Sequence, residues 1–158
     1  MSDKHPDPSS APKRTPAVPK PSASVVLLSP QNEILLLHRV QHSSSFPSAH
    51  VFPGGNVAVK QDGVVPKEDR AARHEDSKAY RLAAIRETFE ESGILLAKDR
   101  RTGRLIEVSE REREDIRKRI HGGKLKFTDW LDGKGARADT GVVPPHTYRL
   151  ARSHVFRL

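Results

Sequence analysis

Several features that define whole classes of protein are missing from this sequence. It contains no cysteine, which excludes disulfide bonds and thiolate metal ligands. No apolar run approaches the length of a membrane-spanning helix, and the N-terminal residues include no apolar stretch typical of a secretory signal. Aromatic residues make up only 5% of the chain and are scattered, which is a poor basis for stacking nucleic-acid bases.

The two ends of the chain carry little sign of regular structure. Six prolines lie among Ser, Lys and Asp in residues 1–22, which predicts a disordered Pro-rich tail. The last three residues, Phe156-Arg157-Leu158, are not the peroxisomal tripeptide Ser-Lys-Leu. The compartment therefore stays open, with the cytoplasm as the default expectation.

Length and composition set the frame for the rest. A chain of 158 residues allows one domain. Hydrophobic content of 35% and a mean hydropathy of −0.65 are low for a domain of this size, so we expect part of the length to be unfolded. The net charge of +8 is uneven: residues 97–158 hold 16 basic and 9 acidic side chains, against 12 and 11 in residues 1–96. Such an excess serves nucleic-acid binding or the steering of a phosphorylated substrate.

The sequence RETFEESGI, residues 86–94, is the most informative stretch. On a helix, Glu87 lies one turn from both Glu90 and Glu91, and Arg86 can reach Glu90. Leu82, Ile85 and Phe89 follow the same three-four spacing and form an apolar stripe, and Gly93 stands where a helix needs a left-handed stop. A charged helix face is ordinarily just solvated, but three carboxylates this close favour a hard cation such as Mg2+ or Mn2+.

The nine-residue string resembles the core of the Nudix hydrolase signature, with Thr88 as the one departure. Upstream, the segment HVFPGG, residues 50–55, resembles the Phe-Pro-Gly-Gly sequence that precedes that signature. The resemblance covers about residues 22–140. It implies an α/β/α sandwich with a mixed sheet, and hydrolysis of a nucleoside diphosphate linked to another moiety.

The same resemblance implies a role for each matching residue. Glu87, Glu90 and Glu91 would hold Mg2+ or Mn2+, a carbonyl of Gly54 would complete the metal shell, and Arg86 would hold the carboxylates in place. Glu87 is a ligand in some relatives and the general base in others, so both roles stay open. An ordinary Pro-Gly turn at residues 53–55 is the alternative to a metal-binding loop.

One part of the signature does not match. About seventeen extra residues lie between Gly55 and Arg86, and the position where the family has its first Glu is Lys78. Glu75 and Asp76 are close but wrongly spaced. A similar insertion occurs in the subgroup of coenzyme A diphosphatase-like proteins represented by Nudix motif 19, which makes coenzyme A or acyl-coenzyme A the first candidate substrate.

The hydrophobic periodicity and the positions of turn and capping residues predict the remaining elements. We expect a Nudix domain over residues 23–140 with an exposed inserted loop at about 57–76. Within it we predict two paired strands at 24–28 and 34–38, a strand at 49–52, the acidic helix from 77 or 78 to 92, a strand at 94–97, a helix from a capping box at Ser109 to His121, and a strand at 125–130.

The C-terminal residues 141–158 read as an irregular basic tail. Pro144 and Pro145 lack the N–H groups that a central strand needs, and the residues after them show no clear period. Relatives continue with strands and a closing helix, so we expect the fold to be incomplete here. One apolar face of the sheet should then lie uncovered.

Three functions compete. The first is a divalent-metal-dependent diphosphatase acting on a small nucleoside diphosphate derivative. The second is a catalytically silent Nudix-like binding module or fragment, favoured by the missing Glu and the unfamiliar tail. The third is a basic nucleic-acid-binding protein, favoured only by charge. The sequence predicts no membrane partner and leaves the oligomeric state open.

Overall fold

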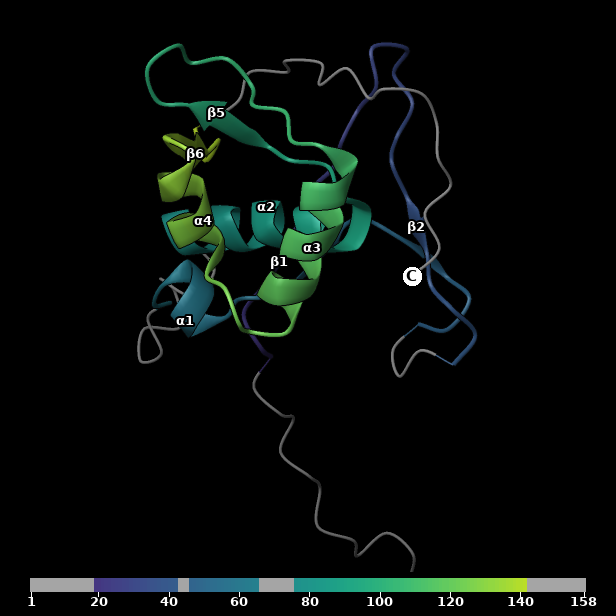
Figure 1. Ribbon diagram of the computed structural model, residues 1–158. Helices are drawn as coiled ribbons and strands as arrows, with labels where there is room; N and C mark the ends of the chain where they lie inside the picture. The colour runs from purple at the N-terminus through teal and green to yellow at the C-terminus, as the bar shows by residue number, and fades with distance from the viewer. Residues whose placement is uncertain (1–18, 43–45, 66–75, 142–158) are drawn as a thin grey trace, which may run out of the picture.

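The computed structural model describes residues 19–42, 46–65 and 76–141, and Figure 1 shows their arrangement. Helix α2 passes behind α3 and α4, and strand β2 lies apart from the helices, on the right of the view. The elements, in chain order, are β1 (Ser22–Ser24), β2 (Leu37–His38), β3 (His50–Val51), β4 (Gly54–Asn56), α1 (Val59–Asp62), α2 (Lys78–Ser92), β5 (Ala97–Asp99), α3 (Glu110–His121), α4 (Phe127–Gly133) and β6 (Ala136–Ala138).

The described strands form three two-stranded antiparallel sheets. β1 pairs with β4, β2 with β3, and β5 with β6. A bridge between Leu28 and Ile34 joins the two predicted strands at 24–28 and 34–38, and the Leu35 N–H donates to the Leu27 carbonyl at 3.0 Å. The α/β class is confirmed, but in the described ranges the sheet consists of these short pairs and not of one continuous mixed sheet.

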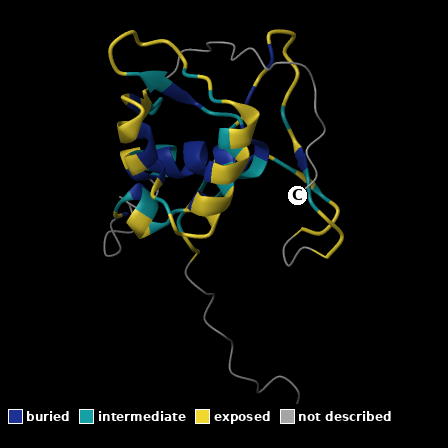
Figure 2. Cartoon of the chain, in the orientation of Figure 1, coloured by how far each residue is buried: buried dark blue, intermediate teal, exposed yellow. Residues whose placement is uncertain are grey.

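Helix α2 forms where the spacing predicted it and is the most deeply buried element (Figure 2). Its apolar stripe faces inward: Phe89 is completely buried, and Leu82 and Ile85 are nearly so. Gly93 ends the helix in the left-handed conformation, with φ of 76°, and its N–H donates to the Phe89 carbonyl at 2.9 Å. The predicted orientation of the acidic helix is therefore confirmed.

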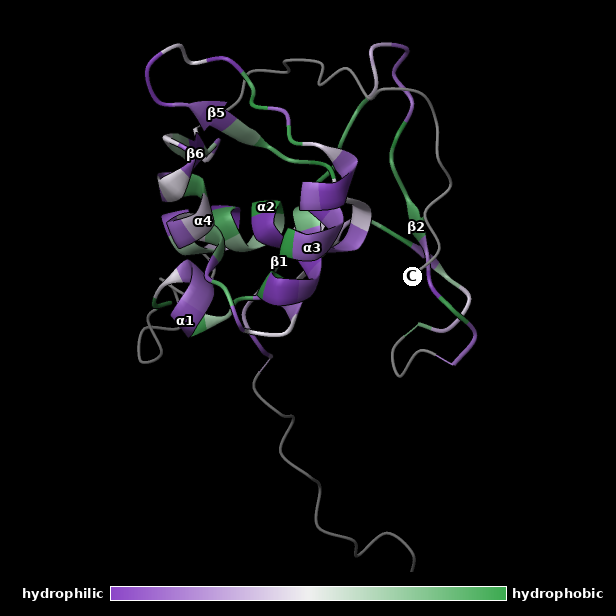
Figure 3. Cartoon of the chain, viewed as in Figure 1, coloured by the Kyte–Doolittle hydropathy of each residue, from purple (hydrophilic) through white to green (hydrophobic). Residues whose placement is uncertain are grey.

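The core is built around stacked aromatic rings. Phe89 lies against Trp130 with ring centroids 5.2 Å apart and planes at 22°, and against Phe127 at 5.8 Å. The apolar residues of α3, Ile116 and Ile120, join the same cluster. Figure 3 shows that the rest of α3 is mainly hydrophilic, in agreement with a surface helix. The predicted cap at Ser109 is confirmed, because its hydroxyl accepts from the Glu112 N–H at 3.3 Å. The Glu112 carboxylate binds Trp130 and Lys134, so the reciprocal half of the capping box is not observed.

Two predicted strands are wrong. Residues 125–130 alternate like a strand, but α4 begins at Phe127. The spacing of Phe127, Trp130 and Leu131 places all three on one helical face, and their burial against Phe89 decides the conformation. The strand expected at 94–97 begins only at Ala97, and residues 94–96 lead into it.

The predicted boundaries of the domain also need correction. Residues 57–65 are not simply an exposed loop, since α1 forms within them and Asp62 is buried. At the N-terminus, the Pro21 carbonyl accepts from the Val57 N–H at 2.9 Å, and β1 begins at Ser22. The predictions for residues 1–18, 66–75 and 142–158 lie outside the described residues.

Several exposed apolar side chains lie on the segment of residues 24–40, here called the ribbon. Leu27 and Leu37 are buried on its inner side. Residues at alternate positions on its outer side are exposed by 39–55% of their surface: Val26, Leu28, Ile34, Leu36 and Val40. Because side chains alternate between the two faces of a strand, this ribbon has apolar side chains on both faces and only one of them is covered.

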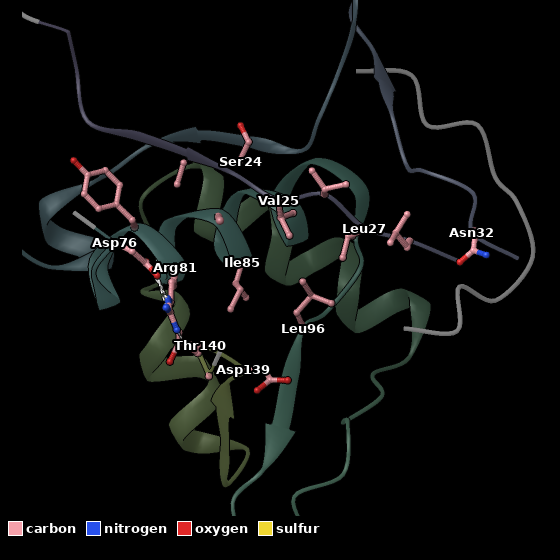
Figure 4. A pocket seen from close by; sticks show the side chains of 16 residues that line it. Ser24, Val25, Leu27, Asn32, Asp76, Arg81, Ile85, Leu96, Asp139 and Thr140 are labelled. Carbon is pink, nitrogen blue, oxygen red and sulfur yellow. Dashed lines mark hydrogen bonds and ion pairs between the residues drawn. The ribbon is translucent and has the colours of Figure 1, made fainter. Parts of the chain in front are cut away.

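An apolar groove of about 460 Å³ lies beside the ribbon (Figure 4). Val25, Leu27, Ile85 and Leu96 line it, and the chain from Asp139 to Gly141 closes one end. A hydrogen bond of 2.9 Å from Arg81 to the Thr140 carbonyl fixes that end. None of the described helices is long and apolar enough to cross a membrane.

Candidate metal and diphosphate site

Arg86 is the centre of the candidate site. Its side chain is only 5% exposed, and its Nε and Nη2 donate to the two oxygens of Asp62, each at 2.8 Å. Its Nη1 donates to Glu87 and to Glu90, both at 2.8 Å, which confirms the predicted pairing along the helix. Burial alone would lower the pKa of Arg86, but the hydrogen bonds to Asp62 and Glu90 outweigh it and raise the pKa above its usual value.

Asp62 is the site residue that the sequence interpretation missed. Its side chain is completely buried and also accepts from the Ala58 N–H at 2.8 Å, so it holds α1 and Arg86 together. This aspartate pairs with the signature Arg where the matched motif lacks its first Glu. The position of the family's first Glu, counted back from Arg86, falls on Lys78, because the inserted residues lie between Asp62 and α2. Counting forward from Gly55 finds an acid seven positions on.

Gly55 provides space for the Glu87 carboxylate. A Cβ atom at Gly55 would lie 2.5 Å from the Glu87 Cδ and 2.7 Å from both carboxylate oxygens, so any side chain there would displace the carboxylate. Glu87 is 19% exposed at its side chain. Desolvation raises the pKa of Glu87, and the charge of Arg86 offsets this only in part.

Gly54 holds the second carboxylate through its backbone. Its N–H donates to Glu91 Oε2 at 3.0 Å, and its φ of 154° together with the closeness of the Ala23 carbonyl leaves no room for a side chain. Desolvation raises the pKa of Glu91, whereas the Gly54 hydrogen bond and the charge of Arg39 oppose the rise. The structure thus places Gly54 beside Glu91, in contact through its N–H, and metal binding by its carbonyl stays a prediction.

Helix α3 contacts the third carboxylate and the end of α2. His121 Nδ1 lies 3.2 Å from Glu90 Oε2, and the other Glu90 oxygen is bound to Arg86. Arg117 donates to the Glu90 carbonyl at 2.7 and 2.9 Å and to the Glu91 carbonyl at 3.0 Å. These bonds satisfy carbonyl groups that a helix end leaves unpaired, and they fix the last turn of α2.

The types of ligand present fit a divalent cation, although in the described ranges they do not form a complete coordination site. Three carboxylates, those of Asp62, Glu87 and Glu90, pair with Arg86, and Glu91 is held by the Gly54 N–H. Desolvation by burial raises the pKa of Glu87 and of Glu91. An all-oxygen set of this kind suits Mg2+ or Mn2+. In the described ranges, however, no three His, Asp or Glu side chains are placed to hold an ion as they stand. The contacts to Arg86, Gly54 and His121 explain this, because each holds a carboxylate oxygen in another direction.

Comparisons with known proteins agree with the motif and the fold. The structure is similar to the crystal structure of a NUDIX hydrolase from Alicyclobacillus acidocaldarius, with a TM-score of 0.54 and 23% identity, over 78% of this chain and 62% of that one. The sequence is 33% identical to the acyl-coenzyme A diphosphatase NUDT19 of Xenopus laevis in an alignment of 122 residues that covers 54% of this chain and 32% of the relative. No family model matches.

The chain therefore resembles the Nudix family in its motif, its sequence and its fold. Within it, the similarity is to the NUDT19-like subgroup, and the chain spans about a third of the length of that curated relative.

Proposed function

We propose that this chain hydrolyses the diphosphate linkage of a nucleoside diphosphate derivative with the help of a divalent metal ion. The observation that carries the proposal is the cluster around Arg86, in which Glu87 and Glu90 pair with the arginine while Glu87 and Glu91 lie against Gly55 and Gly54. Acidic helices that only face solvent do not bury an arginine among their carboxylates. Here the buried ion pairs hold the acidic groups next to backbone that can closely approach a ligand.

Each residue of the cluster has a separate task in this proposal. Glu87, Glu90 and Glu91 would hold Mg2+ or Mn2+. The ion would lower the pKa of the attacking water and neutralise negative charge on the leaving phosphate. The positive charge of Arg86 reduces the repulsion between Glu87 and Glu90 and holds both carboxylates on one side of α2. Gly55 leaves the space that Glu87 occupies, and the Gly54 carbonyl is a further candidate ligand. Glu87 serves either as a ligand or as the general base.

The first candidate substrate is coenzyme A or an acyl-coenzyme A. The support is the similarity to an acyl-coenzyme A diphosphatase. The excess of basic side chains in residues 97–158 suits a polyanionic substrate, because positive charge near a site raises the local concentration of anions.

A catalytically silent binding module is the second candidate. One observation favours it: in the described ranges, no three His, Asp or Glu side chains are placed to hold one metal ion. A silent module would still bind a diphosphate-containing molecule or a metal ion, but would not turn it over.

An assay panel separates these candidates. Coenzyme A, ADP-ribose and NADH are each incubated with the chain and Mg2+ or Mn2+, and phosphorylated products are measured. Turnover that needs the metal and is lost in Glu91→Gln supports the enzyme. The matched control is Glu107→Gln, an exposed carboxylate outside the cluster. Mn2+ binding without turnover of any substrate would support the silent module instead, and binding to DNA or RNA that weakens steeply with salt would favour the nucleic-acid binder.

A further inference from the structure

Two histidines lie side by side away from the glutamate cluster, one on the ribbon and the other on the strand that pairs with it. His38 of β2 and His50 of β3 are directly paired across the two strands. Their ring centroids are 4.9 Å apart and their planes are inclined at 52°. His50 is exposed and His38 is half-buried, so solvent and small ions reach the pair.

The spacing of the rings agrees with shared binding of one metal ion. An imidazole nitrogen binds Zn2+ at about 2.0–2.1 Å, which places the ring centroid roughly 3.2 Å from the ion. Two rings bound at a right angle or a tetrahedral angle then have centroids about 4.5–5.2 Å apart. The observed separation falls within this range. Because His38 and His50 are direct cross-strand partners, their side chains lie on the same face of the strand pair, as a shared ion requires.

The surroundings do not oppose a cation at this position. The neighbours of His38 on its own face of the strand are the apolar residues Leu36 and Val40. Arg39, as the adjacent residue, projects to the opposite face, and its effect on the pKa of Glu91 places it on the side of the glutamates. The nearest strand residue with a positive charge is thereby directed away from the histidine pair.

We propose that His38 and His50 form a second metal site, selective for a borderline transition ion such as Zn2+, Ni2+ or Cu2+. Imidazole suits these ions, whereas Mg2+ prefers oxygen, and water completes the coordination. The ion joins β2 to β3. The chain runs from β3 through Pro53 to Gly54 at the start of β4, whose N–H binds Glu91, so the ion also stabilises the segment that leads to the glycines. This site is independent of the diphosphatase function.

Calorimetric titration of the metal-free chain of 158 residues with Ni2+ and Zn2+ tests the site. The variants are His38→Gln, His50→Gln and the double substitution, and His42→Gln is the matched control because it lies in the same exposed region without a ring partner on β3. We expect each single variant to lose the tightest binding step by about tenfold or more, since one remaining imidazole cannot chelate. The double variant should lose no more than either single variant, and the control should bind like the parent.

Three results would overturn this proposal. One is parent-like binding by His38→Gln or His50→Gln. Another is an equal loss of binding free energy in the two single variants that adds up in the double variant, which would mean that the two rings bind separate ions. The third is displacement of Ni2+ by millimolar Mg2+, which would place the ion at the glutamates. Circular dichroism of every variant establishes that the fold is retained, and the Cu2+ electron paramagnetic resonance spectrum of the parent should show two nitrogen ligands.

Discussion

The end of helix α2 and the ribbon of residues 24–40 differ in how fully their side chains are paired or buried. At the end of α2, a buried arginine is bound on every side, by Asp62, Glu87, Glu90 and the Asn56 carbonyl. On the ribbon, apolar side chains project from both faces, and those on the outer face are left exposed. The local chemistry of the site is therefore assembled although the domain around it is not fully covered. Integrity of the cluster and stability of the fold are separate properties of this chain.

The largest effect should follow from removing charge in the cluster. Glu91→Gln keeps the shape of the helix but removes a metal ligand, so metal-dependent turnover should fall by orders of magnitude with little change in folding. Glu90→Gln should do the same, with some added loss of stability because Glu90 also pairs with Arg86. Product release and thermal unfolding are measured on the same samples. Parent rates in both variants would show that the metal site is wrongly assigned.

The next effect concerns the aromatic core under the cluster. Phe89→Ala should lower the free energy of unfolding by about 3–5 kcal/mol, because the ring is fully buried against Trp130 and Phe127. Denaturant unfolding measures the loss. Phe46→Ala, at a ring that is 74% exposed, is the control and should change little. Equal losses in the two variants would contradict the packing described for α2.

A smaller loss is expected at Asp62. Asp62→Asn removes the charge that binds both Arg86 Nε and Nη2, but Arg86 retains Glu87 and Glu90, so the expected loss is about 1–3 kcal/mol. Asp129→Asn, at an exposed position of α4, is the matched control. If stability and Mn2+ affinity of Asp62→Asn both equal those of the parent, Asp62 does not organise the cluster.

The smallest effect on stability, and a clear one on association, should come from the outer face of the ribbon. We expect the parent chain to be weakly folded, aggregation-prone and poorly active alone, because an exposed apolar face promotes association. Val26→Thr combined with Leu36→Thr should change unfolding by no more than about 0.5 kcal/mol and reduce self-association in sedimentation.

The inner face of the same ribbon supplies the control. Leu27→Thr combined with Leu37→Thr alters two buried side chains and should destabilise strongly. A sharp, cooperative thermal transition of the parent together with robust diphosphatase turnover would contradict the expected weakness of the chain.

The sequence alone was sufficient for features that depend on neighbours along the chain. The spacing of Leu82, Ile85 and Phe89, the Gly93 stop and the Ser109 cap predicted α2 and α3, because helix formation and capping are set by residues three or four positions apart. The pairing of Arg86 with Glu90 follows from the same geometry.

Tertiary structure decided whatever depends on residues far apart in the chain. Asp62 lies 24 positions from Arg86 in the chain, and only the packing of α1 against α2 reveals that the two side chains are partners. In α4, burial of Phe127 and Trp130 against Phe89 overrides an alternating pattern that indicates a strand, since a few buried aromatic contacts outweigh local β propensity. The pairing of His38 with His50 likewise depends on the register of two short strands, which is set when the ribbon folds onto the core.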